Sequence, residues 1–454
     1  MSFTSINPAT GDEIDRYPEL SADELDARLD RAVAGFEANR DRAVAERAQR
    51  LERAADLLED RAEEYGTLMT REMGKPVTQA EAEAEKCAWV CRYYAEHGAD
   101  FLADEPVETE AQTSYVAYEP LGPVLAVMPW NFPFWQLFRF GAPALMAGNA
   151  VLLKHAPNVP GCARAIEELL RDAGFTDHEL QTLLIDEAAV GELLADRRVR
   201  AATLTGSVGA GKAVAQQAAA QVKPTVLELG GSDPFIVCAD ADLEAAASVG
   251  CTARMQNNGQ SCIAAKRFVV EAPVADAFTE RLIEEVEALR IGDPQDSRTD
   301  IGPMARADLR DDVHDQVERA IGEGAVAATG GHTLEREGLY YAPTVLTDVE
   351  PGTVAFEEEI FGPVASVVVA EDADHALRLA NDTRFGLGGS IFTEDREKGE
   401  RMARGLEAGC AFVNEMTKSD PRLPFGGIKD SGYGRELSRH GIREFVNAKT
   451  VWIE

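Results

Sequence analysis

A short apolar segment runs directly into a glycine-rich turn at residues 200–212, RAATLTGSVGAGK. The apolar part, Arg200 to Leu204, predicts a buried strand, and a helix is expected from the turn to about residue 220. A glycine turn at the start of a helix offers backbone N–H groups to a phosphate, and Ser207 adds a side-chain donor. This stretch therefore predicts a strand–turn–helix unit able to bind a nucleotide.

The turn itself leaves three interpretations open. Gly206 to Lys212 has the spacing of a P-loop, but the next residue, Ala213, lacks the hydroxyl that would bind magnesium. Gly209 and Gly211 begin a dinucleotide fingerprint, but Val214 stands at its third glycine. The third interpretation is an ordinary tight turn between a strand and a helix.

The same alternation of strand and helix extends to both sides of the turn. Strands are expected twice within 113–128 and then at 151–153, 180–185, 200–204 and 224–229, and helices at 160–173, 188–195 and up to about 220. That order predicts an α/β fold with a doubly wound parallel sheet, which binds ligands at the carboxyl ends of its strands.

The rest of the chain is read from its periodicity. Residues 21–104 show apolar residues at helical spacing, with Ser21 as a plausible N-cap. A second α/β segment is expected from near Pro234, with a strand at 267–271, helices at 274–289 and 304–322, a strand-rich tract around 340–370 and a last strand at 446–453.

The composition is that of an acidic globular chain. The 454 residues include 79 Asp and Glu and 45 Lys and Arg, which gives a formal net charge of −34. Such a charge argues against a nucleic-acid partner. It is typical of proteins from salt-accumulating microorganisms, in which salt screens the self-repulsion of the surface, so we predict a halophilic protein.

The sequence also predicts a cytoplasmic protein. No apolar run approaches the ~18 residues of a membrane span, because Pro129, Asn131, Pro133 and Arg139 interrupt the best candidate. The N-terminus lacks the basic and apolar regions of a secretion signal. The seven cysteines are scattered and lack the spacing of zinc ligands, so a reducing compartment and no metal site are expected.

One cysteine stands out from the other six. Cys262 follows a run of small and amide-bearing residues, NNGQS at 257–261, which makes a poor core. A reactive cysteine needs accessible backbone and hydrogen-bond donors, whereas a structural one usually lies among aliphatic neighbours. Cys262 is therefore a candidate nucleophile, with a buried structural cysteine as the alternative.

A solitary acid points to the same chemistry. Glu228 ends an apolar strand at Gly230 and Gly231. A desolvated carboxylate has a raised pKa and suits a general base, and the two glycines could act as a hinge that moves it into and out of the site. A satisfied acid of the core is the alternative interpretation.

Taken together, several motifs resemble the aldehyde dehydrogenase superfamily over essentially the whole chain. They are PWNFP at 129–133, Lys154, TGS at 205–207, ELGG at 228–231, GQSC at 259–262, EIFGP at 359–363 and PFGG at 424–427. Within the superfamily, KHAPNVP at 154–160, with Trp135 and Arg139, is similar to short bacterial and archaeal succinate-semialdehyde dehydrogenases.

The resemblance implies a mechanism for residues already singled out. Cys262 attacks the aldehyde, the side-chain amide of Asn131 and the backbone N–H of Cys262 hold the negative oxygen, and Glu228 activates the water that releases the acid. Family members that pass the acyl group to coenzyme A typically lack this glutamate, so its presence favours hydrolysis.

The resemblance also implies NAD or NADP as the cofactor. Trp130 and Lys154 would border the site, with Lys154 at the adenosine ribose. Ser207 would meet a phosphate, and Glu359 and Phe361 would hold the nicotinamide ribose and ring. Many NAD-specific relatives carry a glutamate three residues after the lysine. Pro157 stands there in this chain and neither repels a 2′-phosphate nor grips the ribose diol, so the preference stays open.

The expected substrate is an aldehyde that carries a carboxylate, with succinate semialdehyde preferred over other semialdehydes. Arg139 lies about two helical turns after Asn131 and could hold that carboxylate by a two-pronged ion pair. An arginine on a solvated face is the alternative. Trp135 would wall the tunnel or only pack, and Lys266 and Arg267 are expected to be structural.

Domains and partners follow from the same resemblance. We expect a dinucleotide-binding domain at 1–104 and 121–229 and a catalytic α/β domain at 230–430. The segments 105–120 and 431–454 would form a small β flap that joins subunits into a homodimer or homotetramer. No nucleic-acid or membrane partner is expected.

Two other function classes are weighed against this one. A nucleotide-triphosphate-binding protein built on 206–212 is opposed by Ala213 and by the lack of a clear magnesium-binding acid. A thiol hydrolase using Cys262 would need a base, but none of the seven histidines lies in a suitable motif. His155 and His440 are expected at or near the surface.

Overall fold

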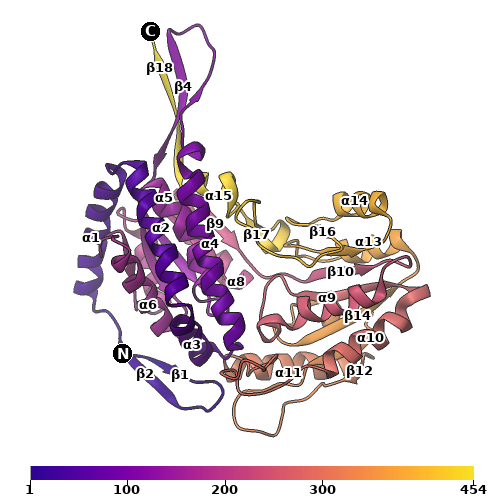
Figure 1. The fold of residues 1–454 in the computed structure, drawn as a ribbon. Coiled ribbons are helices and arrows are strands. Elements are labelled where there is room, and N and C mark those ends of the chain that lie inside the picture. Colours follow the sequence, from indigo (N-terminus) through magenta and orange to yellow (C-terminus); the bar gives the residue numbers. More distant parts are fainter. Residues whose placement is uncertain (1) are drawn as a thin grey trace.

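The computed structural model describes residues 2–454 and has the predicted α/β architecture. Sheets of six and seven strands form the two halves of the body, and two small antiparallel sheets lie outside them (Figure 1). The predicted domain boundaries stay a prediction, although the two large sheets divide the chain near the expected place.

The six-stranded sheet is the predicted doubly wound one. In the order of the sheet its strands are β17 (Gly432–Tyr433), β9 (Thr225–Glu228), β8 (Ala201–Thr205), β5 (Pro123–Met128), β6 (Ala150–His155) and β7 (Leu180–Thr182). All are parallel except β17, which pairs antiparallel with β9. The carboxyl ends of the four central strands therefore lie along one edge, where a ligand site is expected.

Four helices lie between these strands: α5 (Trp135–Ala147), α6 (Pro160–Asp172), α7 (Ala188–Ala195) and α8 (Val208–Ala220). The last three agree with the predicted helices, whereas no range was predicted for α5. Ser207 caps α8 by accepting a hydrogen bond from the N–H of Ala210. A Cβ on Gly211 would lie 2.4 Å from Leu229, so glycine is required there for the close approach of α8 to β9.

Four helices precede this sheet in the chain, as the periodicity predicts. They are α1 (Ala22–Arg40), α2 (Val44–Asp60), α3 (Ala62–Met73) and α4 (Val77–Phe101). Ser21 caps α1 through a reciprocal capping box with Glu24. The sequence did not predict the hairpin of β1 (Ser2–Ile6) and β2 (Glu13–Pro18), because most of its side chains are exposed and show no apolar alternation.

The seven-stranded sheet carries the second half of the chain. In sheet order its strands are β12 (Val326–Thr329), β13 (Thr344–Thr347), β14 (Val364–Ala370), β11 (Ala265–Glu271), β10 (Asp233–Val237), β15 (Ser390–Phe392) and β16 (Phe412–Val413). Only β12 is antiparallel. The helices of this half are α9 (Leu243–Met255), η1 (Gln256–Gly259), η2 (Ala272–Val274), α10 (Ala275–Glu287), α11 (Ala307–Gly322), α12 (Val354–Glu357), α13 (Ala373–Asn381), α14 (Arg396–Gly405) and η3 (Lys429–Ser431).

A β flap projects from the body, as the sequence predicts. It consists of β3 (Glu105–Pro106), β4 (Thr113–Pro120) and β18 (Val446–Ile453), and β4 and β18 pair antiparallel over their whole length. Figure 1 shows this ribbon extending well beyond the helices, with α15 (Ser438–Arg443) at its base. Trp452 and Ile453 at its tip are about half exposed.

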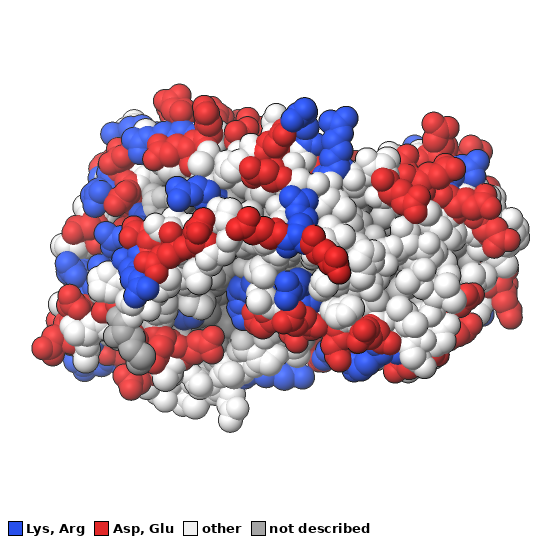
Figure 2. Space-filling model, turned by 90° about the horizontal axis from the view of Figure 1, so that it is seen from below, with Lys and Arg blue, Asp and Glu red and all other residues white. Residues whose placement is uncertain are grey.

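The surface is acidic but mixed. Figure 2 shows Asp and Glu spread over one whole face, with Lys and Arg between them rather than in one patch. Many of these charges form exposed ion pairs, such as Arg16 with Glu13 and Arg404 with Glu400. Within residues 2–454, no helix is both long and apolar enough to cross a membrane.

Candidate active site

The predicted nucleophile lies between the two large sheets. Cys262 follows η1 and precedes β11, at the amino edge of the seven-stranded sheet, and this edge faces the carboxyl edge of the six-stranded sheet. Asn257, Asn258 and Gly259 all have positive φ, at 58°, 57° and 71°. Asn and Gly are the residues that adopt this conformation most readily, which explains the composition of the run.

Buried side chains fix the loop in this unusual shape. The Asn257 amide donates to the carbonyl oxygens of Asn131 and Gln260, both at 2.9 Å. The buried guanidinium of Arg254 donates to the carbonyl oxygens of Gly259 and Ile360. The loop that carries Cys262 is therefore tied both to the loop after β5 and to the segment before β14.

Two cavities meet at Cys262. One, of about 300 Å³, is lined among others by Lys86, Phe132, Trp135, Arg139, Lys418 and Phe425. The other, of about 260 Å³, is lined among others by Trp130, Asn131, Ser207, Leu229, Glu359 and Phe361. Cys262 and Gln136 line both, so a molecule in either cavity would reach the same sulfur.

Cys262 is half-buried, and its thiol is neutral in the protein without ligands. Burial raises its pKa to about 11, although the nearby charges of Arg139 and Lys266 act in the opposite direction. Positive charge brought close to the sulfur would therefore favour the reactive thiolate.

Asn131 lies where a donor to a negative oxygen is needed. Its side chain is 3% exposed, and its amide donates one hydrogen bond to the carbonyl oxygen of Gln260 at 3.1 Å. An amide nitrogen carries two hydrogens, so one remains for a ligand oxygen in the cavity shared with Cys262.

Glu228 is the last residue of β9 and is 2% exposed. Neither carboxylate oxygen has a hydrogen-bond partner in the described part of the chain. Burial raises the pKa of Glu228 well above its ordinary value; Glu436 adds to this effect, and the charge of Arg139 opposes it. The carboxylate lines neither cavity, so it would have to rotate to act at Cys262.

The two glycines after Glu228 have a packing role in this structure. A Cβ on Gly230 would lie 2.2 Å from the carboxylate of Glu359, and one on Gly231 would lie 2.7 Å from the carbonyl oxygen of Cys262. Glycine is therefore required at 231, where the neighbour is backbone, whereas a Cβ at 230 would displace the Glu359 carboxylate. Whether the same glycines act as a hinge stays a prediction.

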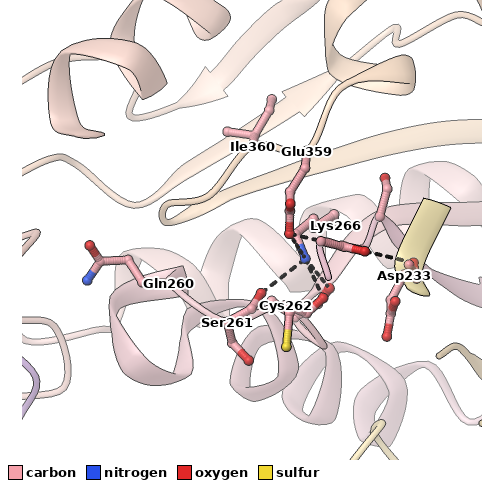
Figure 3. A network of polar contacts seen from close by, with 12 residues as sticks. Asp233, Gln260, Ser261, Cys262, Lys266, Glu359 and Ile360 are labelled. Carbon is pink, nitrogen blue, oxygen red and sulfur yellow. Dashed lines mark hydrogen bonds and ion pairs between the residues drawn. The ribbon is translucent and has the colours of Figure 1, made fainter. Parts of the chain in front are cut away.

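A buried lysine connects the nucleophile loop to Glu359. Lys266 donates to the carbonyl oxygens of Ser261 and Cys262, at 3.0 and 2.8 Å, and pairs with the Glu359 carboxylate at 3.4 Å (Figure 3). The same carboxylate accepts the N–H of Gly231 at 3.1 Å. Figure 3 shows the Cys262 sulfur pointing away from this network, so the lysine orients the loop without blocking the thiol.

Most predicted cofactor residues come together in the second cavity. Trp130 and Phe361 meet edge to face with ring centroids 5.9 Å apart. Ser207, Glu359 and Phe361 also line this cavity. Lys154 and Pro157 do not line this cavity; they lie at and beyond the carboxyl end of β6, on the same edge of the sheet. Burial lowers the pKa of Lys154.

The predicted substrate residues line the first cavity, but Arg139 has a partner that the sequence did not indicate. Its guanidinium forms a buried ion pair with Glu436, donates to the Thr205 hydroxyl at 3.3 Å and lies over the ring of Phe425. Arg139 and Glu436 are 2% and 3% exposed. Trp135 forms part of the cavity wall, as expected.

The P-loop interpretation of residues 206–212 finds no support in the local geometry. Gly209 and Gly211 already belong to α8, so the turn after β8 is too short to wrap a triphosphate. The Lys212 side chain is 69% exposed and lies 3.7 Å from Asp430, away from the turn.

The histidines do not supply a base for Cys262. His155, expected near the surface, is instead buried: its Nε2 lies 2.8 Å from the carbonyl oxygen of Pro133, and burial lowers its pKa to about 4. The reason is that the loop before α5 covers the end of β6. His440 is exposed, as predicted. Within residues 2–454, no hydrogen bond joins a histidine to Cys262.

Two residues at the site, Lys86 and Glu436, were not singled out by the sequence analysis. Lys266 was expected to be structural, and it does hold the nucleophile loop in place. Lys86 lies on α4 within a polar helical stretch, and Glu436 lies in a loop, so neither had a local signal. Only the packing of distant segments brings Lys86 to the first cavity and Glu436 to Arg139.

Comparison with known proteins agrees with this geometry. A family model described as the aldehyde dehydrogenase family matches residues 1–451. A probable succinate-semialdehyde dehydrogenase (NADP(+)) of Synechocystis sp. is 56% identical over 453 residues and covers all of both chains. The succinate semialdehyde dehydrogenase (NAD(P)+) Sad of Escherichia coli is 49% identical, over 99% of this chain and 97% of its own.

Solved structures agree over the full length as well. The succinic semialdehyde dehydrogenase of Streptococcus pyogenes, solved with NADP+ as the cofactor, superposes with a TM-score of 0.97 at 36% identity and covers 99% of each chain. A structure described as giving insight into cofactor and substrate selection by Gox0499 superposes at 0.98 and 41% identity, over all of both chains.

Proposed function

This chain belongs to the aldehyde dehydrogenase family, and we propose that it oxidises succinate semialdehyde to succinate with NADP+ or NAD+ as the acceptor. The observation that carries the proposal is the position of Cys262 where two cavities meet. A nucleophile there can react with an aldehyde held in one cavity beside a dinucleotide held in the other. The names of the relatives support the choice of substrate.

The residues of the second cavity fit a dinucleotide. The N-terminus of α8 behind Ser207 presents backbone N–H groups to a phosphate. The Glu359 carboxylate, fixed by Lys266 and the N–H of Gly231, can accept hydrogen bonds from a ribose. The edge-to-face pair of Trp130 and Phe361 gives the cavity an aromatic wall. When bound, the dinucleotide supplies the hydride acceptor.

Cys262 and Asn131 carry the first half of the reaction in this proposal. The thiolate forms a bond to the aldehyde carbon, and the former carbonyl oxygen becomes negative. The free N–H of the Asn131 amide and the backbone N–H of Cys262 stabilise that oxygen. Loss of one such donor typically lowers the rate about 10²- to 10³-fold. Departure of a hydride from the same carbon leaves a thioester on Cys262.

Glu228 acts in the second half of the reaction, the hydrolysis of the thioester. Its carboxylate takes a proton from water, the resulting hydroxide adds to the thioester carbon, and the bond to sulfur breaks to release the acid. Burial raises the pKa of the Glu228 carboxyl, while the charge of Arg139 opposes this and favours the carboxylate; the raised pKa makes that carboxylate a stronger base than an exposed glutamate.

The acid-binding end of the substrate cavity contains several cations. Lys86, Arg139 and Lys418 all line it. In a chain with a formal net charge of −34, an anionic substrate needs such local positive charge. Arg139 and Trp135 both form part of the wall at this end of the cavity.

We also propose a homodimer or homotetramer in the cytoplasm. The edge of the β flap has unpaired strand groups, and Trp452 and Ile453 expose apolar surface near its end, which a second copy could cover. The seven cysteines are all free, which suits a reducing compartment. Pro157 neither repels nor grips a 2′-phosphate, so both dinucleotides are retained in the proposal.

A substrate panel tests the proposed function. Initial rates of dinucleotide reduction would be measured with succinate semialdehyde, pentanal and benzaldehyde, with NAD+ and with NADP+, at low and at high salt. We expect the highest kcat/KM for succinate semialdehyde. Activity that is equal on all three aldehydes would overturn the substrate, and no dinucleotide reduction with any of them would overturn the reaction.

A further inference from the structure

The amide donor and the nucleophile of the site lie on two different loops. Asn131 lies between β5 and α5, whereas Cys262 lies between η1 and β11. In the proposed function, on which this inference rests, the Asn131 amide and the backbone N–H of Cys262 stabilise the same negative oxygen. Such donors act when they lie about 2.7 to 3.1 Å from that oxygen. The two loops must therefore be fixed relative to each other.

One buried acid holds the loop of Asn131. Glu83 belongs to α4 and is 4% exposed, and one of its carboxylate oxygens accepts the backbone N–H groups of Phe134 and Trp135, both at 2.9 Å. These N–H groups are the first of α5, where a negative charge is favourable. Phe134 stands at the N-cap and has no acceptor in its side chain, so Glu83 replaces the missing cap. The loop is thus attached to α4 three residues after Asn131.

A buried lysine completes this attachment. Lys75 is fully buried, and its ammonium group forms an ion pair with the second carboxylate oxygen of Glu83. The ammonium also lies 4.1 Å from the ring centroid of Phe132, the residue that follows Asn131. A cation over an aromatic ring is attracted to it. The ion pair therefore contacts the loop at Phe132 and again at the start of α5.

The same part of the chain also holds the loop of Cys262. The side-chain amide of Asn258 donates to the carbonyl oxygen of Gly74 at 3.0 Å. The side-chain oxygen of Gln79 accepts the backbone N–H of Asn257 at 2.7 Å. Both asparagines have positive φ, so these contacts fix the part of the loop with the unusual backbone shape.

We propose that residues 74–83, called the linking segment below, hold the Asn131 amide at the right distance from Cys262. Glu83 is the positioning residue of this segment, and it acts through the loop that carries Asn131. Without its carboxylate, two buried N–H groups at the start of α5 would lack an acceptor, and the loop would shift toward another partner. A shift of about 1 Å between reacting groups can lower a rate about 100-fold.

A single substitution of Glu83 would leave Lys75 buried without its partner, which is strongly unfavourable for folding. The test therefore compares two double variants that both contain Lys75→Met. Lys75→Met/Glu83→Gln keeps an oxygen that can accept both N–H groups. Lys75→Met/Glu83→Leu keeps the approximate volume and loses the acceptor. Neutral groups of similar volume often replace a buried ion pair without loss of stability, so the two variants differ mainly in the acceptor.

The two double variants should differ in activity. Lys75→Met/Glu83→Gln should keep kcat/KM for succinate semialdehyde within about threefold of the wild type, because the acceptor at α5 remains. Lys75→Met/Glu83→Leu should lose about 10- to 100-fold, because the loop of Asn131 shifts. The KM for the dinucleotide should change little in both. Equal kcat/KM in the two variants, whether high or low, would overturn the positioning role.

The same comparison in an Asn131→Ala background shows whether the effect passes through the amide. Asn131→Ala should itself lower kcat/KM about 10²- to 10³-fold. With no amide left to position, Lys75→Met/Glu83→Leu should then add less than about a threefold loss, because the two changes affect one interaction. A loss that keeps its full size in this background would assign the effect to the cavity wall at Trp135 and overturn the proposal.

A second variant covers the case in which Lys75→Met/Glu83→Leu folds poorly. Gln79→Leu removes the contact with Asn257 and leaves the buried ion pair intact. Loss of one hydrogen bond should lower kcat/KM about 3- to 10-fold, and the loss should again nearly vanish in the Asn131→Ala background. Alkylation of Cys262 by iodoacetamide forms no negative oxygen, so its rate should stay within about twofold of the wild type in a folded Gln79→Leu. A Gln79→Leu loss of equal size in both backgrounds would overturn the proposal.

The outcomes separate this proposal from the function on which it rests. A wild-type enzyme that reduces no dinucleotide with any aldehyde would overturn the proposed function. An active enzyme in which Asn131→Ala leaves kcat/KM unchanged would overturn the role of the amide and of the linking segment with it. A large loss in Asn131→Ala, combined with equal activity of the two double variants, would overturn the role of Glu83 alone.

Discussion

Lys266 and Glu359 form an ion pair in which the ammonium and the carboxylate lie 3.4 Å apart, and the same ammonium donates to the carbonyl oxygen of Cys262 at 2.8 Å. One buried lysine thus joins the nucleophile loop to the acid proposed to hold the nicotinamide ribose (Figure 3). In the proposed complex this lysine would fix the nucleophile loop relative to the acid that holds the dinucleotide.

Replacing Lys266 with methionine should misalign the two halves of the site. A shift of about 1 Å between reacting groups can lower a rate about 100-fold, so we expect kcat to fall about 10- to 100-fold and the KM for the dinucleotide to rise. The KM for the aldehyde should change little. Steady-state rates with each reactant varied would show this pattern. Lys398→Met, whose lysine pairs with Asp240 and lines neither cavity, is the matched control. An unchanged KM for the dinucleotide in Lys266→Met would contradict the positioning role.

Alkylation of Cys262 should accelerate as the pH rises. Burial raises the pKa of this thiol to about 11, so below that value the thiolate fraction grows about tenfold per pH unit. The rate of inactivation of the dinucleotide-free enzyme by iodoacetamide should follow this slope from pH 7 to 9. Cys262→Ala identifies the reacting residue by mass spectrometry. A rate that is flat over this range would mean that the thiol is already ionised at neutral pH.

Glu228→Gln should separate the two halves of the reaction. The glutamine cannot take a proton from water, so the thioester should form and then persist. We expect a burst of reduced dinucleotide of about one equivalent per site, followed by a steady state slower by about 10²- to 10⁴-fold. Rapid-mixing absorbance and a mass increase on Cys262 would detect both features. A variant that loses the burst as well would show that Glu228 is needed before the thioester forms.

Local patterns explain how much of the fold the sequence could predict. The strands near Val151, Ala201 and Thr225 were found because short apolar runs alternate with segments of helical periodicity, and Ser21 was found as an N-cap because the acidic residues that signal the helix start directly follow it. The hairpin of β1 and β2 was missed because its strands are mostly exposed and stabilised by packing against distant parts of the chain.

The residues of the site also divide into those with a local sequence signal and those without one. Cys262, Glu228 and Asn131 lie in short motifs with unusual composition, and the resemblance to a family gave them roles. Lys86 could not be found, because Glu85 and Cys87 beside it look like an ordinary helix, and only Ser419 and Trp135 reveal where its amine lies. The partner of Arg139 was missed for the same reason, since Glu436 is about 300 positions away in the chain.

The acidic surface predicts a dependence of stability on salt. With a formal net charge of −34, the folded chain repels itself, and salt screens exposed charges over a length that shrinks from about 10 Å at 0.1 M to about 3 Å at 1 M (Figure 2). The melting temperature should therefore rise by several degrees between low and molar potassium chloride. Scanning calorimetry in a salt series, with a neutral solute of equal osmolality as the control, measures this. A constant melting temperature would remove the basis for a halophilic protein.

The preference for an acidic aldehyde should weaken above pH 8. Lys86 lines the acid-binding end of the substrate cavity, and its pKa is lowered to about 8, first by burial and then by Arg139, while Cys87, Glu83 and Asp420 act in the opposite direction. Below this pH the ammonium is charged and can bind a carboxylate. As the pH rises through this value, the free enzyme loses that charge and with it the affinity for the anion. The kcat/KM of an enzyme reports the pKa values of its free form.

The measurement is the ratio of kcat/KM for succinate semialdehyde to that for pentanal, from pH 6.5 to 9.5. The ionisation of Cys262 affects both aldehydes and cancels in the ratio, and the substrate carboxylate stays charged throughout. The ratio should be constant at the acidic end and fall about tenfold per pH unit above pH 8. In Lys86→Met it should be low and flat, and in Lys418→Met, which removes a lysine already paired with Glu415, it should keep the wild-type shape. A wild-type ratio that does not change with pH would assign the carboxylate to a group that stays charged throughout, such as Arg139.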